Sequence, residues 1–447
     1  MNRRFSSTRR RLLKSALAAT AGWSLNRGGP IHAQESKSTA DESQAAAAVE
    51  SAHETIWRRF IDRHNLLLDY TARNGDVPRP TADDCRQCKP NALAWWTPIE
   101  NGAMFNGMYL DGACLRWKRS GLDADRDKAD RLASGLLLLN SISEVPGFIG
   151  RGVADDGRTP YPMGSNDQTG PWLVGLWRYL REVQPTGELR TRIVDQWLAV
   201  ARALEASGWR MPCSGGPSLY RGGFAGFAWE HAPRLLFLLK AAQELSGDEH
   251  WRQLYERSAA ETGGSPALSR ADICAAGMRF HRPEVRESWT GASGVIALRA
   301  LWEMERDESL KAKYLEGLRR SADLAAGGIE LHRQFNNADE SKFLYDWREL
   351  NAWWRPQQSE AEAVEVAELE SKQFGRLSPR RGLEFRFVRE PLFASWIVTM
   401  CPDAQIVAAH RAAIVAALAH YQYQRLYYSQ FFPAEAAWYR LQMLGSG

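Results

Sequence analysis

The chain has 447 residues and a formal net charge of +4. Residues 1–33 contain seven Lys or Arg and no acidic residue, so the remainder of the chain carries a net charge of −3. That balance gives no reason to expect nucleic acid as a partner. No later apolar run is long enough to cross a bilayer as a helix, so we also expect no stable membrane span.

The first 33 residues have the pattern of a twin-arginine export signal. Three arginines at positions 9–11 precede a modest apolar run at 16–25, and Ile-His-Ala at 31–33 is typical of a signal cleavage site. We therefore expect cleavage after residue 33. The Tat export machinery would be a partner of the signal, and the mature protein would be periplasmic or extracellular.

The composition after the signal favours a lead-in followed by one large domain. Residues 34–50 are rich in Ala, Ser, Glu and Gln, and we expect them to be disordered. Residues 51–447 contain no segment that reads as a linker between two domains, so we predict a single domain. Its first helix is expected at 53–70, from an apolar stripe, and residues 74–99 are expected to form a Pro-rich loop.

The chain has six scattered cysteines, and only Cys85 and Cys88 lie close together, in DDCRQCKP. A single C-x-x-C lacks the two further ligands that a structural zinc site needs. A local disulfide or a pair of free thiols is the favoured interpretation for an exported protein. The chain also has no phosphate loop, nucleophile elbow, H-E-x-x-H helix or dinucleotide fingerprint. We therefore expect neither a metal nor a cofactor.

From residue 105 onward one pattern recurs: an apolar helix, a short turn and an amphipathic helix. The turns of the five copies are centred on Gly121, Gly187, Gly247, Asp307 and Asp403. The apolar first helix of each copy should be buried, and the striped second helix should lie outside it.

With a first helix at 53–70 and a last one at 434–444, the repeat predicts twelve helices in six hairpins. Six hairpins close naturally into an all-α, (α/α)6 toroid. Strand signals are nearly absent, and the alternating run at 383–388, LEFRFV, is expected to form a small hairpin in a loop.

The long connections all fall between hairpins, at 141–168, 208–227, 277–290 and 329–390, whereas the turns within hairpins are short. All of them would lie on one rim, because each hairpin leaves and returns on the same side. A rim that carries the long loops is the expected place for a binding or catalytic site.

The loop that runs from Gly150 into the helix near Trp172 is the richest in chemistry. We expect Asn166 or Asp167 either to cap the following helix or to act in the site. The candidate site residues from this loop are Arg151, Tyr161, Asn166, Asp167 and Trp172.

Two further loops supply aromatic, basic and histidine side chains. His231 is a candidate catalytic residue, although a lone His is often structural. The Arg residues near 280 suit a carboxylate, with surface ion pairs to Glu284 and Glu287 as the alternative. The candidates from these loops are Tyr220, Arg221, Trp229, Glu230, His231, Arg279, His281, Arg282 and Trp289.

The 329–390 insertion is expected to cover one side of the rim, with Asp346 and Arg348 as its candidate binding residues. Residues 360–374, which lie in an acidic stretch, are predicted to form a solvated amphipathic helix without special chemistry.

Two segments carry a family resemblance. Glu100-Asn101 before GAMFNGMYLDGA, and SNDQTGPWLVGLWRY, together with the hairpin repeat and the 18 Trp residues, resemble the six-hairpin toroid glycosidases, nearest to the unsaturated-uronyl hydrolases. The resemblance implies a carboxylate at the start of each of two inner helices. Asp167 matches the second position, and this chain has Glu100 where the family has Asp.

Trp95, Trp96 and Trp172 are the candidates for an apolar wall that would raise the pKa of the proton-donating carboxyl. A first-turn acid favoured by the helix dipole is the alternative interpretation of Glu100.

Three functions remain open at this point. The first is a glycoside hydrolase acting on an acidic or unsaturated oligosaccharide, with Asp167 as acid/base and Glu100 as its partner. The second is a polysaccharide lyase acting on a polyuronate, with roles for Asn166, His231, Arg279 or Arg282, and Tyr161 or Tyr220. The third is a non-catalytic glycan-binding protein.

Overall fold

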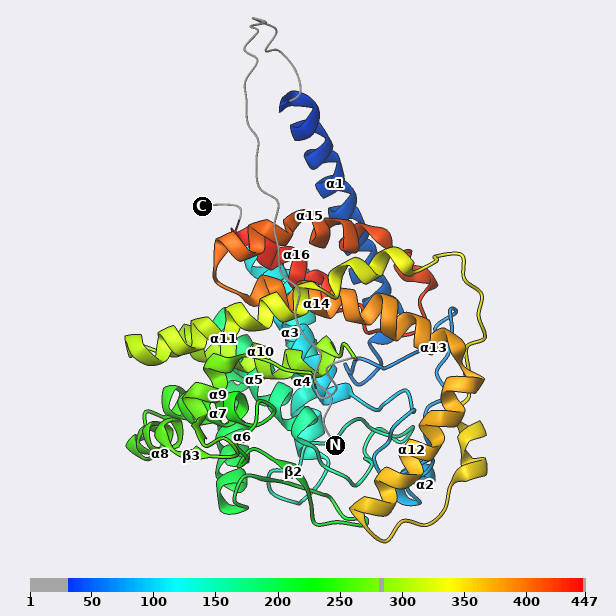
Figure 1. Ribbon diagram of the computed structural model, residues 1–447. Coiled ribbons are helices and arrows are strands. Elements are labelled where there is room, and N and C mark those ends of the chain that lie inside the picture. The colour runs from blue at the N-terminus through cyan, green and yellow to red at the C-terminus, as the bar shows by residue number, and fades with distance from the viewer. Residues whose placement is uncertain (1–30, 281–284, 445–447) are drawn as a thin grey trace, which may run out of the picture. The chain divides into compact units, whose positions relative to one another are not determined.

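The computed structural model describes residues 31–280 and 285–444. Most of the predicted signal lies outside these residues, as do the candidates His281 and Arg282. Helices dominate this part of the chain, which contains only four short strands, and the predicted all-α class is confirmed (Figure 1). Of the helices in the described ranges, none combines the length and the hydropathy that a bilayer crossing demands.

The five predicted hairpins are all present in the described part of the chain, and a final helix follows them. Their bounds are α3 Gly102–Ser120 and α4 Asp123–Ser141, α5 Asn166–Glu182 and α6 Gly187–Ala206, α7 Ala232–Ser246 and α8 Glu249–Ala260, α10 Ser288–Met304 and α11 Glu308–Ala326, and α14 Glu390–Met400 and α15 Ala404–His420, with α16 Pro433–Leu444 last.

The hairpin turns form where the sequence predicts them, for identifiable local reasons. Gly121 and Gly247 end α3 and α7 in the left-handed conformation, which glycine adopts without steric cost. Asp307 and Asp403 instead begin the second helices, because their carboxylates accept hydrogen bonds from free backbone N–H groups of α11 and α15. Gly187, with φ +62°, opens α6.

Burial follows the predicted division between first and second helices. Every residue of α5 from 168 to 180 is buried, whereas α6 buries a stripe that includes Ile193, Trp197 and Leu204. The apolar composition of the first helices and the striped pattern of the second ones therefore determine which helix of each pair enters the core.

The first helices of the hairpins pack against one another. Helix α3 contacts α5 and α16, α16 contacts α14, α14 contacts α10, and α10 contacts α7 and α5. The closest crossing joins α3 to α5. A Cβ added to Gly175 would lie 2.5 Å from the Cα of Gly107, and one added to Gly107 would overlap the carbonyl oxygen of Pro171. Glycine is required at this crossing because the two backbones leave no room for a side chain.

Two predictions near the amino end are wrong. Residues 34–50 belong to α1, Ile31–Thr55, rather than to a disordered lead-in, and Ala45 and Val49 are buried in the hydrophobic core. The helix predicted at 53–70 ends with the π-helix η1, Ile56–Phe60. It stops there because the Asp62 carboxylate accepts hydrogen bonds from two later backbone N–H groups and stabilises a turn instead.

The long insertion before α14 is largely helical. It contains η2 Ile329–Gln334, η3 Trp347–Trp353, α12 Glu360–Leu377, α13 Pro379–Glu384 and η4 Phe385–Arg389. The strand-like run at 383–388 is therefore helical. Arg380 and Glu384 lie one helical turn apart and form an ion pair at 2.7 Å, which stabilises the helix. The helix predicted at 360–374 is confirmed as α12, but it is not simply solvated, because Val366, Ala367 and Phe374 are buried.

The remaining elements lie in loops. They are α2 Ala82–Arg86, the antiparallel pair β1 Arg210–Pro212 and β2 Tyr220–Gly223, the antiparallel pair β3 Thr262–Gly263 and β4 Leu268–Ser269, α9 Arg270–Ala276 and η5 Tyr423–Arg425.

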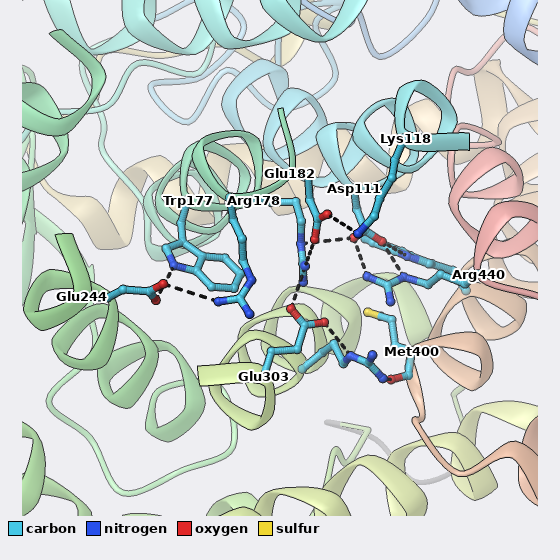
Figure 2. A network of polar contacts seen from close by, with 12 residues as sticks. Asp111, Lys118, Trp177, Arg178, Glu182, Glu244, Glu303, Met400 and Arg440 are labelled. Carbon is cyan, nitrogen blue, oxygen red and sulfur yellow. Dashed lines mark hydrogen bonds and ion pairs between the residues drawn. The ribbon is translucent and has the colours of Figure 1, made fainter. Parts of the chain in front are cut away.

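A buried polar network joins the first helices toward their carboxyl ends (Figure 2). The fully buried carboxylate of Asp111 on α3 accepts two hydrogen bonds from Arg440 on α16, at 2.8 and 2.5 Å, and one from the indole of Trp396 on α14, at 2.8 Å. Arg178 on α5 lies 3.6 Å from the same carboxylate and also pairs with Glu303 on α10, at 2.7 Å.

We predict that Asp111→Asn destabilises the protein by about 3–5 kcal/mol, because it leaves the buried guanidinium of Arg440 without a compensating charge. Urea unfolding followed by circular dichroism measures the change. Asp127→Asn, at an exposed position of α4, is the matched control and should be nearly neutral. A loss below about 1 kcal/mol for Asp111→Asn would show that the network does not depend on its charge.

Candidate functional site

A cavity of about 400 Å³ lies at the amino ends of α3, α5 and α10. Four acidic and four basic side chains line it: Asp69, Glu100, Asp167 and Glu287, and Arg151, Arg221, Arg381 and Arg389. A larger cavity, of about 1160 Å³, lies at the carboxyl ends of the same helices. Its arginines 178, 299 and 440 are engaged with Glu303 and Asp111 in the buried network. The smaller cavity is the better candidate site, because charged groups there face open space.

Glu100 and Asn101 immediately precede α3 rather than lying in its first turn, so the helix-dipole interpretation of Glu100 is wrong. Glu100 Oε2 accepts a hydrogen bond from the backbone N–H of Trp96 at 2.8 Å. Asn101 donates twice to the carboxylate of Asp69, through its backbone N–H at 2.8 Å and its side-chain amide at 2.7 Å. These two hydrogen bonds hold the segment around Asp69 against the start of α3 at the cavity wall.

Burial controls the protonation of this acidic group. Desolvation raises the pKa of Glu100. Desolvation, reinforced by the charge of nearby Glu100, raises the pKa of Asp69 well above its usual value. Both shifts are toward the protonated forms of these carboxyl groups.

Asp167 lies in the first turn of α5 but does not cap that helix. Ser165 is the N-cap, and its hydroxyl accepts from the backbone N–H of Asp167. The capping interpretation of Asn166 and Asp167 is therefore wrong. The side chain of Asp167 is 53% exposed, and Arg234 on α7 donates to its carboxylate at 3.2 Å. Arg234 itself is buried, and its Nε and Nη1 atoms have no hydrogen-bond partner in the described residues.

Arg151 and Arg221 come to the cavity from the loops that precede α5 and α7. Arg151 is buried and donates to the carbonyl oxygen of Glu100 at 3.1 Å. Burial, with the nearby charge of Arg221, lowers the pKa of Arg151 to about 10, so it remains a cation near neutral pH. Arg221 lies 3.6 Å from the carboxylate of Glu360 on α12.

Tryptophans form part of the wall. Trp95, Trp96 and Trp289 line the cavity. The indole N–H of Trp96 donates to the backbone carbonyl of Ala367 on α12 at 3.0 Å, which fixes the ring against the insertion. Trp172 does not reach this wall. It lies wholly in the core, where its N–H donates to the carbonyl oxygen of Leu136 at 2.8 Å.

Other predicted site residues lie away from the cavity. Tyr161 is buried, and its hydroxyl donates to the carbonyl oxygen of Lys89. Tyr220 packs under the guanidinium of Arg210 at 4.1 Å. Asn166 is packed so closely by Gly222 that a Cβ there would lie 2.9 Å from its Oδ1. These three side chains support the loops rather than face the open space.

Five further candidates, Trp229, Glu230, Arg279, Asp346 and Arg348, also lie outside the lining of this cavity. Trp229 and Arg279 line a separate cavity of about 160 Å³, where Arg279 donates to Glu230 at 3.3 Å. Asp346 caps η3 by accepting from the backbone N–H of Arg348, whose guanidinium donates to the carbonyl oxygen of Arg79. These contacts are structural.

His231 stands at the start of α7, outside the cavity lining. Its Nδ1 is buried without a hydrogen-bond partner among the described residues, and burial followed by the charge of Arg234 lowers its pKa. His231 is only partly buried and lies outside the cavity lining, so it is poorly placed to act on a ligand in the cavity.

The sequence analysis did not identify five charged residues at or beside the site as candidates: Asp69, Arg234, Glu287, Arg381 and Arg389. Arg234 had a recognisable signal, because it lies in the first turn of an otherwise apolar helix, APRLLFLLK. Asp69, Arg381 and Arg389 reach the site through long-range packing, which leaves no mark on the local pattern.

A scan against protein-family models and searches of curated proteins and of solved structures find no match to the chain. Across residues 31–280 and 285–444, no group of three or more His, Cys, Asp or Glu side chains is arranged to hold a metal ion. Cys85 and Cys88 are free thiols, and burial raises the pKa of both.

Helix α12 is tied to the tryptophan loop by a buried pair of polar side chains. Asn91 donates to Glu370 Oε2 at 2.6 Å and accepts from the backbone N–H of Trp95 at 3.1 Å. Glu370 is fully buried, and its other oxygen has no partner in the described residues. Desolvation raises the pKa of Glu370 to about 8, which favours its neutral form.

This raised pKa predicts a pH-dependent stability. The folded state keeps a proton on Glu370 that the unfolded state releases above about pH 4.5. The free energy of unfolding is therefore highest at low pH and falls as the pH rises toward 8. Glu370→Gln should be more stable than the wild type at pH 8, by on the order of 3–5 kcal/mol, and nearly equal to it at pH 4.5. Denaturant unfolding at both pH values measures the difference.

Glu368→Gln, an exposed position two residues earlier on α12, is the control and should change stability equally little at both pH values. A constant difference between Glu370→Gln and the wild type across this range would contradict the assignment.

Proposed function

We propose that the protein is an exported carbohydrate-active enzyme, a glycoside hydrolase that acts on an acidic or unsaturated oligosaccharide. One observation carries the proposal. Glu100 and Asp167, at the amino ends of the adjacent helices α3 and α5, line one cavity together with tryptophans and arginines. Paired carboxyl groups supply acid/base chemistry, tryptophan stacks on the apolar face of a sugar, and arginine binds a carboxylate.

The same proposal includes the (α/α)6 toroid. Helix α3 contributes Met104 to the smaller cavity and Lys118 to the larger one, and α5 contributes Asp167 and Arg181 in the same way. These helices, and α10, therefore run in one direction between the two cavities. Parallel first helices that contact their neighbours in sequence are the arrangement that a toroid of hairpins requires.

This direction supports an acidic ligand. The amino end of a helix carries a partial positive charge and free N–H groups, so a cavity at several amino ends attracts anions. The four arginines add to that potential, and the raised pKa values of Asp69 and Glu100 reduce the opposing negative charge. An acidic sugar therefore suits the cavity better than a neutral one.

The pKa directions also suggest how the two carboxyl groups divide the work. Glu100, with its raised pKa, suits the donor that protonates the departing oxygen or the substrate double bond. Asp167, half exposed and paired with Arg234, suits the carboxylate that orients the attacking water. This reverses the assignment of Asp167 as the proton donor while keeping the same pair.

The lyase alternative has less support, because it needs a base beside the arginines. His231, Tyr161 and Tyr220 lie outside the cavity lining. The tyrosines that do line it, Tyr70 and Tyr428, have pKa values raised by burial, which opposes loss of the phenolic proton. Carboxyl groups are therefore the better-placed acid/base residues.

The first experiment offers purified protein a panel of polyuronates and their unsaturated oligosaccharides and follows ultraviolet absorbance and reducing ends together. Falling absorbance supports an unsaturated-uronyl hydrolase, and new ends at constant absorbance support an ordinary hydrolase. Rising absorbance with new ends would instead identify a lyase. No change on any substrate would favour a glycan-binding role.

We predict that Asp167→Asn lowers kcat by about 100-fold or more, because the amide cannot activate water. Glu100→Gln should lower kcat similarly. Asp195→Asn, on the exposed face of α6, is the matched control and should retain wild-type activity. Unchanged turnover by Asp167→Asn in a folded variant would refute the paired-carboxyl mechanism.

A further inference from the structure

Two arginines of the cavity, Arg381 and Arg389, come from the helical insertion before α14. Arg381 is in α13 and Arg389 ends η4. Both side chains line the cavity near Glu100. The insertion thus covers the cavity and also supplies two of its four cations.

The guanidinium of Arg381 packs against three aromatic rings and lies within electrostatic reach of Glu100 and Asp69. Its guanidinium lies 4.3 Å from the ring centre of Trp96, 4.4 Å from that of Phe385 and 5.2 Å from that of Phe374. Within residues 31–280 and 285–444, no hydrogen bond or ion pair engages this guanidinium. Its N–H groups therefore remain available to a ligand while the aromatic rings hold its plane in place.

Arg389 is similarly held. Its guanidinium lies 3.9 Å from the ring centre of Phe385 and 4.6 Å from that of Trp289, and it donates to Gln430 at 3.2 Å. Its Nε is buried without a hydrogen-bond partner in the described part of the chain. Burial, and then the like charge of Arg381, lowers the pKa of Arg389 to about 9, so Arg389 remains a cation near neutral pH.

Two neighbouring cations on a shared phenylalanine repel each other. Glu100, Glu287 and Glu390 offset part of this repulsion at Arg389, and an anion that binds both guanidiniums would relieve more of it. Their open N–H groups form planar forks, which match a carboxylate better than a spherical ion. Trp96 and Trp289, which lie against the two guanidiniums, offer flat apolar surfaces for the ring that carries that carboxylate.

We propose that Arg381 and Arg389 form the subsite that binds the carboxylate of a uronic acid residue, so that the insertion determines the preference for acidic sugars. This inference rests on the proposed function, because it assumes that the cavity takes a sugar. The sequence analysis assigned the carboxylate contact to the arginines of the 277–290 loop, but Arg279 lines a different cavity. The present proposal assigns that contact to the insertion.

The experiment measures binding without turnover, by titration calorimetry with methyl glucuronide as the probe and methyl glucoside as its neutral counterpart. The wild type should bind the glucuronide in preference to the glucoside. Arg381→Gln should weaken glucuronide binding by roughly tenfold or more and leave glucoside binding unchanged. Arg386→Gln, an exposed arginine of η4 outside the cavity lining, is the matched control and should bind like the wild type.

Arg381→Lys is the second variant, because it keeps the charge and the ring contacts but loses the planar fork. It should also weaken glucuronide binding, and it keeps the test informative where Arg381→Gln fails to fold. Wild-type affinity in either folded variant, or no preference of the wild type for the glucuronide, would overturn the proposal. If Arg381→Gln loses glucuronide binding but the wild type shows no catalysis on any substrate, the proposed hydrolase activity is refuted while the proposed carboxylate subsite is supported.

Discussion

The position of the site depends on the close crossing of α3 and α5. Gly107 and Gly175 let the two backbones approach until no side chain fits between them. The amino ends of the two helices, with Glu100 and Asp167, are held at the same cavity. Farther along the same helices, Asp111 and Arg178 join the polar network with α10, α14 and α16. One end of the helix group is thus fixed by ion pairs, and the crossing positions the other end for binding.

Hydrophobic periodicity predicted the hairpins well, because each helix carries its own stripe and each turn carries its own Gly or Asp. Periodicity failed where polar side chains close in sequence decided the outcome. The Asp62 carboxylate stops the first helix by binding backbone N–H groups, and the alternating run at 383–388 becomes helical beside the Arg380–Glu384 ion pair. Alternation alone does not distinguish a strand from a short helix packed on a cavity wall.

The site was only partly predictable, because some of its residues come from distant parts of the chain. Glu100, Asn101, Arg151, Asp167, Arg221 and Trp289 were predicted from loops and helix starts, and all of them line the cavity. Trp172 lies five residues beyond Asp167, far enough along α5 to point into the core. Arg381 and Arg389 come from a segment more than 200 residues away in sequence, and only the folded chain brings them beside Glu100.

The two ends of the helix group use arginine in opposite ways. At the carboxyl ends, Arg178, Arg299 and Arg440 each have an acidic partner, and their charges also oppose the negative ends of the helix dipoles. At the amino ends, the dipoles already favour anions, yet the insertion adds the cation Arg381, which packs against three aromatic rings and lies within electrostatic reach of Glu100 and Asp69. The arginines of the carboxyl ends are used up in ion pairs within the protein, whereas the planar fork of Arg381 is the group that we propose a ligand carboxylate engages.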